Sequence, residues 1–488
     1  GAIAIGVGAG GSNMTSDADD SVGIGRNALN ALTSGIGNVA VGYAALVAED
    51  DGDYNTAVGY QALTAQTGTS GDVGNTAVGY QSSLAITLGK YNTSLGVQSL
   101  KTEDVGNFST ALGYNSMYSQ NSDSNNEVTG NTGLGAYTGF YNVTGQNNTY
   151  VGYNAGFGAS GQSNSNNVGI GKDALLTIKT GGSNVCIGVE CMSDVDAGNN
   201  SGASAQNIFI GHAAGNGGWA DTQTDGCVAI GYAALQGALD NVDGTIAIGS
   251  QSLKSVTTGA GNLAIGYQAG TSLVEGQYNT VLGYQALDAG EEDSACVAIG
   301  YKALTAADVS NTGNPVSSYN TAIGYQSGES LTTGLRNTFF GALTGDAFDV
   351  ENDNTFVGYA SGHGAINGAD KCVAVGSLSL GGAITGDGHI AIGYSALAAL
   401  TSGGTSIAIG NEALISQTTG GNNIAIGQSA GDSLNHADAD SNILIGNDAG
   451  RGGAAAMQKC IAIGTSAMDA TAGNAQTGTI AIGHDALT

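Results

Sequence analysis

The sequence predicts an all-β fold: a parallel β-solenoid of about 27 coils with a seventeen-residue minimal repeat, running as one continuous array over residues 1–488. Three observations support this prediction. A short glycine-centred motif recurs along the whole chain, its spacing has a fixed minimum, and its residues alternate between bulky and small.

The repeated motif has the form Asn-Thr-Ala-Val-Gly-Tyr-Gln-Ala-Leu at 55–63, and 27 variants follow one another along the chain. We number each copy from its central glycine, position 0, which is Gly59 in this copy. There are 26 spacings between central glycines. Fourteen of them equal seventeen, none is shorter, and the others run from 18 to 24. A fixed minimum with variable excess predicts a coil of constant circumference with loops inserted at its corners.

The residues before the glycine predict a short β-strand. Position −1 is bulky and apolar in all 27 copies, position −3 is Val, Ile or Leu in 17 copies and Thr in ten, and position −2 is small in 21. This alternation has the period of a strand. Because β-branched residues suit a buried pleated surface, we expect positions −3 and −1 to face the interior. The Ala/Gly row at position −2 is then predicted to form a flat face on which copies of the chain meet.

Two corners complete the predicted coil. Position −4 is Asn in 16 copies, and Asn tolerates left-handed backbone and can form side-chain amide ladders. A second glycine stands at position +10 in 12 of the 14 shortest spacings. One coil is therefore predicted to run from strand to corner, then through a second short extended segment to a glycine corner.

Composition excludes several classes of protein. The chain has 84 glycines without a Gly-X-Y period, so it is not collagen. With 40 acidic and 11 basic residues, a net charge of −29, it is not expected to bind nucleic acid or dock on an anionic membrane. Its apolar stretches, such as 39–48, are too short to cross a bilayer, so no membrane insertion is expected.

The six cysteines fall into two groups. Four occupy position −4 in coils at least four steps apart, too far for pairing within one chain, and are expected to be buried thiols in place of Asn: Cys227, Cys296, Cys372 and Cys460. Cys186 and Cys191 flank Gly188. We favour unpaired thiols here, because a straight strand would splay them apart, and a local disulfide is the alternative.

No arrangement predicts catalysis, and we expect no enzyme activity and no resident cofactor. The histidines are scattered, and no catalytic or phosphate-binding motif is present. Solvated loop charge is the favoured interpretation of four acidic clusters, with weak Ca²⁺ binding as the alternative: Asp17, Asp19 and Asp20; Glu49, Asp50, Asp51 and Asp53; Glu291, Glu292 and Asp293; Asp349, Glu351 and Asp353. The candidate binding residues lie in inserted loops. They are Trp219, for sugar stacking or alternatively for capping a coil, and Pro315 in the longest insertion.

The motif resembles two groups of fibrous proteins. Asn/Ser-x-Ala-Ile/Val-Gly repeats are similar to the heads of trimeric autotransporter adhesins. The Asn-Thr-Ala-Val-Gly-Tyr-x-Ala-Leu form, with Tyr after the glycine in 12 copies, is closer to arrays in phage tail fibres. The resemblance implies a left-handed β-roll, a homotrimer and an extracellular location. Because the chain shows neither stalk nor anchor, we expect a segment of a longer fibre.

These features together predict a structural and adhesive rod segment of a homotrimeric phage tail fibre. The expected partners are two further copies and a host-surface glycan or protein receptor. The nearest alternative is the head of a bacterial surface adhesin, and a glycan-cleaving tailspike is less favoured. An ice-binding solenoid is also disfavoured, because the ten Thr residues at position −3 share the face assigned to the interior.

Overall fold

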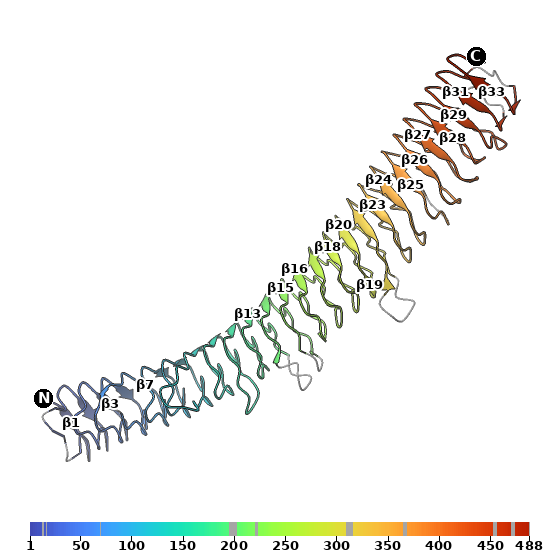
Figure 1. The fold of residues 1–488 in the computed structure, drawn as a ribbon. Coiled ribbons are helices and arrows are strands. Elements are labelled where there is room, and N and C mark those ends of the chain that lie inside the picture. Colours follow the sequence, from blue (N-terminus) through green and yellow to red (C-terminus); the bar gives the residue numbers. More distant parts are fainter. Residues whose placement is uncertain are drawn as a thin grey trace. The chain divides into compact units, whose positions relative to one another are not determined.

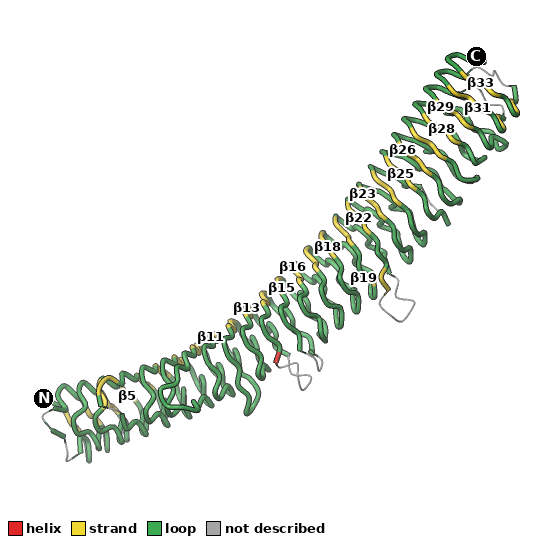
Figure 2. Tube along the Cα trace, in the orientation of Figure 1, coloured by secondary structure: helices red, strands yellow, loops and turns green. Residues whose placement is uncertain are grey.

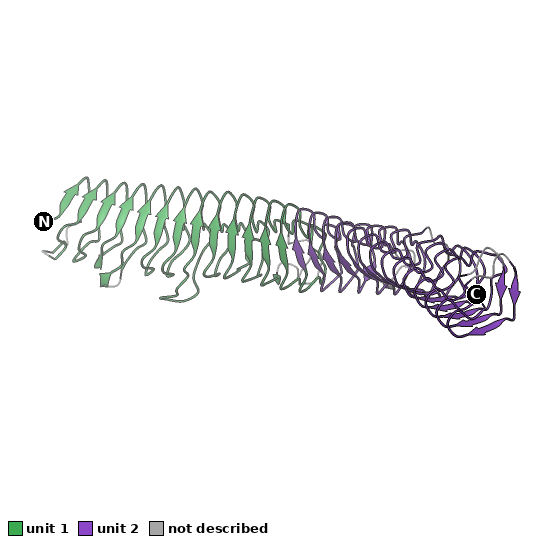
Figure 3. Cartoon of the chain, turned by 90° about the horizontal axis from the view of Figure 1, so that it is seen from above, with its two compact units in different colours: residues 1–245 green, residues 246–488 purple. Residues whose placement is uncertain are grey.

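The computed structural model describes residues 1–11, 14–15, 17–68, 70–194, 203–219, 223–308, 316–364, 368–451, 456–469 and 474–487. The chain forms two compact units, Gly1–Thr245 and Ile246–Thr488, coloured separately in Figure 3. Each unit is an all-β parallel β-solenoid, and the two contain about 26 turns of a ~17-residue repeat. The predicted fold class is confirmed. The handedness of the coil and the single continuous array stay predictions.

Unit 1 stacks thirteen three-residue strands into one parallel sheet (Figure 1). They are β1 (Ile3–Ile5), β2 (Val22–Ile24), β3 (Val39–Val41), β5 (Thr56–Val58), β7 (Thr76–Val78), β8 (Thr93–Leu95), β9 (Thr110–Leu112), β10 (Thr132–Leu134), β11 (Thr149–Val151), β12 (Val168–Ile170), β13 (Val185–Ile187), β14 (Ile208–Ile210) and β15 (Val228–Ile230).

Unit 2 stacks fourteen such strands in the same way. They are β16 (Ile246–Ile248), β17 (Leu263–Ile265), β18 (Thr280–Leu282), β20 (Val297–Ile299), β22 (Thr321–Ile323), β23 (Thr338–Phe340), β24 (Thr355–Val357), β25 (Val373–Val375), β26 (Ile390–Ile392), β27 (Ile407–Ile409), β28 (Ile424–Ile426), β29 (Ile443–Ile445), β31 (Ile461–Ile463) and β33 (Ile480–Ile482).

Neighbouring strands pair in register, so equivalent positions of the motif form straight columns. In unit 1, Thr56 is opposite Thr76 and Ala57 is opposite Ala77. The central glycine is required at the end of each strand because its backbone has positive φ and because a side chain would collide with the next coil. At Gly59, where φ is 140°, an added Cβ would overlap the carbonyl group of Gly79.

The segment after the central glycine differs from its prediction. It is a run of turns and not an extended segment, and loops and turns make up most of the coil (Figure 2). Gln61 and Leu63 take left-handed backbone, and both Ala62 and Leu63 are buried. Successive side chains of a strand point to opposite faces, so only a turn can bury both. Three pairs of two-residue strands lie nearer the second corner: β4 (Gly52–Asp53) with β6 (Gly71–Asp72), β19 (Asp293–Ser294) with β21 (Val316–Ser317), and β30 (Met457–Gln458) with β32 (Gln476–Thr477).

The asparagines at position −4 form the predicted ladder inside the coil. Asn92 is buried, its Oδ1 accepts a hydrogen bond from the Ser109 N–H at 2.9 Å, and its Nδ2 donates to the carbonyl of Gly106 at 2.8 Å. Further along, the Nδ2 of Asn148 donates to Oδ1 of Asn131 at 3.1 Å. Each Asn thus joins the strand corner to the glycine corner and one coil to the next.

The two faces of the strand are reversed from their prediction. In every three-residue strand except β1 the residue at position −2 is buried, whereas positions −3 and −1 point outward and are partly or largely exposed. Inside the coil the residue at position −2 shares its space with buried side chains of the turn, such as Ala62 and Leu63, so a small residue usually stands there. The predicted meeting of copies on the −2 row is therefore wrong.

Aromatic residues at position −2 fit inside because Gly stands at position +4 of the same copy, where many other copies have Leu. The buried ring of Phe339 occupies the space that side chains would need at Gly328 and Gly345, where an added Cβ would lie 2.9 and 2.8 Å from the ring. Tyr150 fills the corresponding space beside Gly156. The large ring at position −2 takes the volume that the missing side chain at position +4 leaves free, so the interior stays close-packed.

Candidate interaction face

The outward face of each sheet, formed by positions −3 and −1, is uncharged and largely apolar. No Asp, Glu, Lys or Arg stands at position −3, −2 or −1 in any of the 27 copies, although the chain has a net charge of −29. The exposed residues at position −1 include Ile24, Leu95, Leu134, Ile170 and Ile187 in unit 1, and Ile265, Phe340, Val375, Ile392, Ile409, Ile426 and Ile463 in unit 2. We call this surface the outer sheet face. Soluble monomers rarely expose apolar stripes of this extent.

Threonines form continuous rows on the outer sheet face. In unit 1 six successive strands, β5 to β11, place Thr at position −3 in register: Thr56, Thr76, Thr93, Thr110, Thr132 and Thr149. In unit 2 the row Thr321, Thr338 and Thr355 is shorter. The assignment of these threonines to the interior is wrong. Each lies at the surface and is partly or largely exposed.

Tyrosines follow the outer sheet face along one edge. Position +1 comes directly after the glycine that ends the strand, and its Tyr rings stack from coil to coil. In unit 2 the ring centroids of Tyr267 and Tyr284 are 5.1 Å apart, those of Tyr284 and Tyr301 5.4 Å, and those of Tyr301 and Tyr325 5.2 Å. Aromatic residues are enriched in protein interfaces, so this edge extends the candidate surface.

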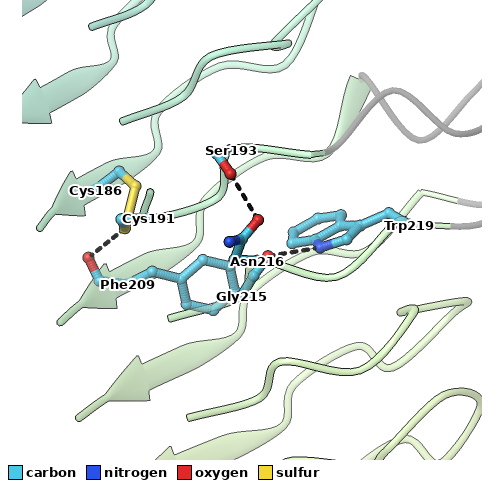
Figure 4. Close-up of a disulfide and its surroundings, with 7 residues drawn as sticks. All are labelled: Cys186, Cys191, Ser193, Phe209, Gly215, Asn216 and Trp219. Atoms are coloured by element: carbon cyan, nitrogen blue, oxygen red, sulfur yellow. Dashed lines mark hydrogen bonds between the residues drawn. A yellow bond between two sulfur atoms is a disulfide. The ribbon is translucent and has the colours of Figure 1, made fainter. Parts of the chain in front are cut away.

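Of the two predicted loop residues, Trp219 lies inside the coil. Its side chain is fully buried, its Nε1 donates to the carbonyl of Gly215 at 2.9 Å, and its ring packs edge-on against Phe209 with centroids 5.9 Å apart (Figure 4). The exposure that sugar stacking requires is contradicted, and packing at the coil fits the alternative. Pro315 lies outside the described residues, so its binding role stays a prediction.

The favoured interpretation of Cys186 and Cys191 is wrong, because the two form a disulfide (Figure 4). Cys186 occupies position −2 and Cys191 position +3, and both positions point inward from the two sides of the corner at Gly188. The corner brings their Cα atoms to 5.8 Å, a usual separation for a disulfide. The strand does not splay them apart, because it ends between them.

The four cysteines at position −4 are buried free thiols, as predicted. Each backbone N–H still donates to the Oδ1 of the Asn in the preceding coil, as Cys296 does to Asn279 at 2.9 Å. Burial raises the pKa of Cys227 and of Cys296 to about 12 and that of Cys372 to about 11. Thiols that stay protonated are poor nucleophiles and poor metal ligands.

His389 also replaces Asn at position −4. It is buried, its Nδ1 accepts from the Ser406 N–H at 3.2 Å, and its Nε2 has no hydrogen-bond partner among the described residues. Desolvation lowers the pKa of His389, with a smaller opposing effect of the Asp387 charge. His389 is therefore held neutral and serves the ladder in place of an amide.

Glu49, Asp50 and Asp51 are the one acidic group whose ligand atoms lie within 4.8 Å of one another in the part of the chain that the structure describes. The Glu49 side chain points into the coil, where its Oε1 accepts from the Gly52 N–H at 2.7 Å, and burial raises its pKa. This carboxylate closes the second corner from inside. Solvated loop charge, the favoured interpretation, is wrong for Glu49 and for the likewise buried Asp293 and Glu351. Weak Ca²⁺ binding stays the alternative.

No helix among the described residues is long and apolar enough to span a membrane. Comparison with known proteins finds no matching family model, no similar curated protein and no similar solved structure.

Proposed function

We propose that the chain is a structural and adhesive rod segment of a homotrimeric extracellular fibre, of the kind found in phage tails. The observation that carries the proposal is the outer sheet face, which stays free of charge through every repeat of a strongly acidic chain. Copies that meet on this face keep their acidic residues apart and remove its apolar side chains from water.

The size of the outer sheet face supports association. A three-residue strand is about 10 Å long, and strands are spaced ~4.8 Å apart. The thirteen strands of unit 1 therefore present about 600 Å², so a pair of copies would bury about 1,200 Å² through this unit alone. That area is at the lower end of stable specific interfaces, and the fourteen strands of unit 2 add a similar amount.

A matched pair of variants tests which surface associates. Ile409→Asp with Ile426→Asp places two charges on the outer sheet face, whereas Asn435→Asp with Ala437→Asp places two charges in an exposed loop. We expect the first variant to sediment as a monomer and the second as the wild-type assembly, with both keeping the wild-type circular dichroism. Assembly that survives the face charges would refute association through this face.

The adhesive role needs its own experiment. The fluorescently labelled wild-type chain is expected to bind the surface of a subset of strains in a bacterial panel, and unlabelled chain should compete for the sites. An excess of the chain should slow adsorption of a phage that uses the same receptor. Absence of binding across the panel would remove the adhesive part and leave the structural part.

Two observations favour other candidates. The disulfide is typical of proteins that mature in an oxidising compartment, which favours the secreted adhesin head over a fibre assembled in the cytosol. The Thr rows on the outer sheet face favour an ice-binding surface, because they repeat methyl and hydroxyl groups at the regular spacing of the coils. Thermal hysteresis that is lost in Thr93→Lys with Thr110→Lys would establish ice binding, and none in the wild type would exclude it.

A further inference from the structure

We propose that the stacked tyrosines at position +1 are an oxidative cross-linking site, at which a one-electron oxidant joins successive coils of the same chain through dityrosine. There are two such tyrosine ladders. The unit 1 ladder consists of Tyr43, Tyr60 and Tyr80, and the unit 2 ladder consists of Tyr267, Tyr284, Tyr301 and Tyr325.

The ladders place reactive rings side by side. Neighbouring centroids are 4.9 to 5.5 Å apart and the ring planes lie within 20° of parallel. The spacing is fixed by the backbone, because each N–H two residues beyond the central glycine bonds to the tyrosine carbonyl of the preceding coil. The Gln285 N–H, for example, donates to the Tyr267 carbonyl at 3.0 Å. To couple, two such rings must rotate from this stacked arrangement until an ortho carbon of one meets an ortho carbon of the other, and no movement of the backbone is required to keep them neighbours.

The same rings are open to an oxidant. Tyr284 is 44% exposed and Tyr301 is 41% exposed. Hydrogen bonds between Gln side-chain amides hold the coils in register beside the rings: Nε2 of Gln268 donates to Oε1 of Gln251, and Nε2 of Gln285 to Oε1 of Gln268, each at 2.9 Å. The site thus combines access from solvent with fixed neighbours, the two conditions that coupling requires.

The reaction balances with hydrogen peroxide as the oxidant and a haem peroxidase as the catalyst. Each of two tyrosines loses one electron and its phenolic proton, which leaves two tyrosyl radicals. The radicals join by a new carbon–carbon bond between ortho positions, and the two displaced ring hydrogens move to the phenolic oxygens. The two electrons and two protons reduce one peroxide molecule to two molecules of water.

The fold supplies a matched comparison. Tyr394 also stands at position +1 and is 50% exposed, but the equivalent positions of the coils on either side are Ser377 and Asn411. Exposure alone would make Tyr394 at least as reactive as Tyr284. If coupling instead requires a neighbouring tyrosine ring, links within one chain should form only in the tyrosine ladders.

The test oxidises the full chain at micromolar concentration with a haem peroxidase and limiting peroxide. The monomer band of a denaturing gel is digested, and linked peptides are identified by mass spectrometry. Every link in the monomer band joins two residues of one chain, and neighbouring rings have effective concentrations of the order of millimolar. The coils on either side of Tyr394 carry no tyrosine at position +1, so Tyr284–Tyr301 links should exceed links that include Tyr394 by roughly a hundredfold. Links distributed according to exposure, with Tyr394 as abundant as Tyr284, would overturn the proposal.

Conservative variants provide the second readout. Tyr284→Phe keeps the ring stack and removes one phenol, so the Tyr267 and Tyr301 links to residue 284 should disappear while the Tyr301–Tyr325 link persists. Tyr394→Phe should leave dityrosine fluorescence of the monomer band unchanged. Equal losses of fluorescence in the two variants would contradict the assignment, whatever the assembly state of the chain.

Discussion

Adjacent phenylalanines on strand β23 offer a direct test of which way the strand faces. Phe339 stands at position −2 and is fully buried, whereas Phe340 stands at position −1 and is 54% exposed. Each can be replaced by Ala without changing charge or strand length. If the small-residue row lines the interior, only the first substitution creates a cavity.

The expected magnitude follows from the contacts of the two rings. The Phe339 centroid lies 5.5 Å from that of Phe356 and 5.6 Å from that of Phe348, both buried. Removal of such a ring costs about 3–5 kcal/mol, and the glycines beside it offer no side chain to refill the space. Phe340→Ala on the monomer removes a half-exposed ring and should cost about 1 kcal/mol or less.

Native-state hydrogen exchange of peptides covering β22 to β24 measures this difference. Solenoids open locally, so a loss of about 3 kcal/mol should accelerate exchange of these amides more than about a hundredfold in Phe339→Ala. Phe340→Ala should change it less than about tenfold at a concentration where the chain is monomeric. The reverse order, or equal effects, would refute the inward assignment of position −2.

Four further outcomes are expected. Asn92→Ala leaves the Gly106 carbonyl and the Ser109 N–H without their partner and should destabilise its coil by about 2–4 kcal/mol, measured by the same exchange method. Replacement of Cys186 and Cys191 by Ala should cost about 2 kcal/mol, because the short loop they close is freed in the unfolded chain, and the loss should appear in chemical denaturation. The four buried thiols should resist a thiol reagent at pH 8 in the native chain and react fully in denaturant, so fast native labelling would contradict their burial. Burial lowers the pKa of His389, so on acidification its imidazole is protonated at a higher pH in the unfolded chain than in the folded chain. The contribution of His389 to stability should therefore be complete above about pH 6.5 and fall below it. His389→Asn should remove that dependence from thermal unfolding curves.

The repeat, the strand and both corners were predictable because each leaves a periodic mark on the sequence. The minimum spacing of the central glycines fixes the coil, and Asn at position −4 marks the ladder that the structure shows. The orientation of the strand was not predicted, because a preference for β-branched residues on a pleated face does not say which face is inside. In a coil this thin, the volume of the side chains decides which face of the strand lies inside.

A signal for the orientation was nevertheless present. Position +4 is Leu in 13 copies and Gly in ten, and Gly stands there in every copy with an aromatic residue at position −2, as in the pairs Phe339 with Gly345 and Tyr150 with Gly156. Such compensation is expected only between side chains that share the interior. The same logic would have placed Cys186 against Cys191, since positions −2 and +3 are both small and both inward.

The burial of loop residues was harder to predict from the sequence. Trp219 has a composition around it that is typical of exposed loops, yet its ring fills space beside Phe209, a residue that is itself an exception at position −2. Phe209 and Trp219 belong to the same coil, one before and one after its central glycine Gly211, and their buried rings pack against each other inside it. Sequence reasoning that treats each loop separately does not detect this coupling.

Sedimentation equilibrium of the wild-type chain tests the central claim most directly. Association of three copies through the outer sheet face predicts a particle with three times the 47.8 kDa mass of one chain. That mass should fall to the single-chain value when Ile409 and Ile426 are both replaced by Asp. A wild-type particle of 47.8 kDa at every concentration would contradict the account, because the apolar outer sheet face would then have no partner.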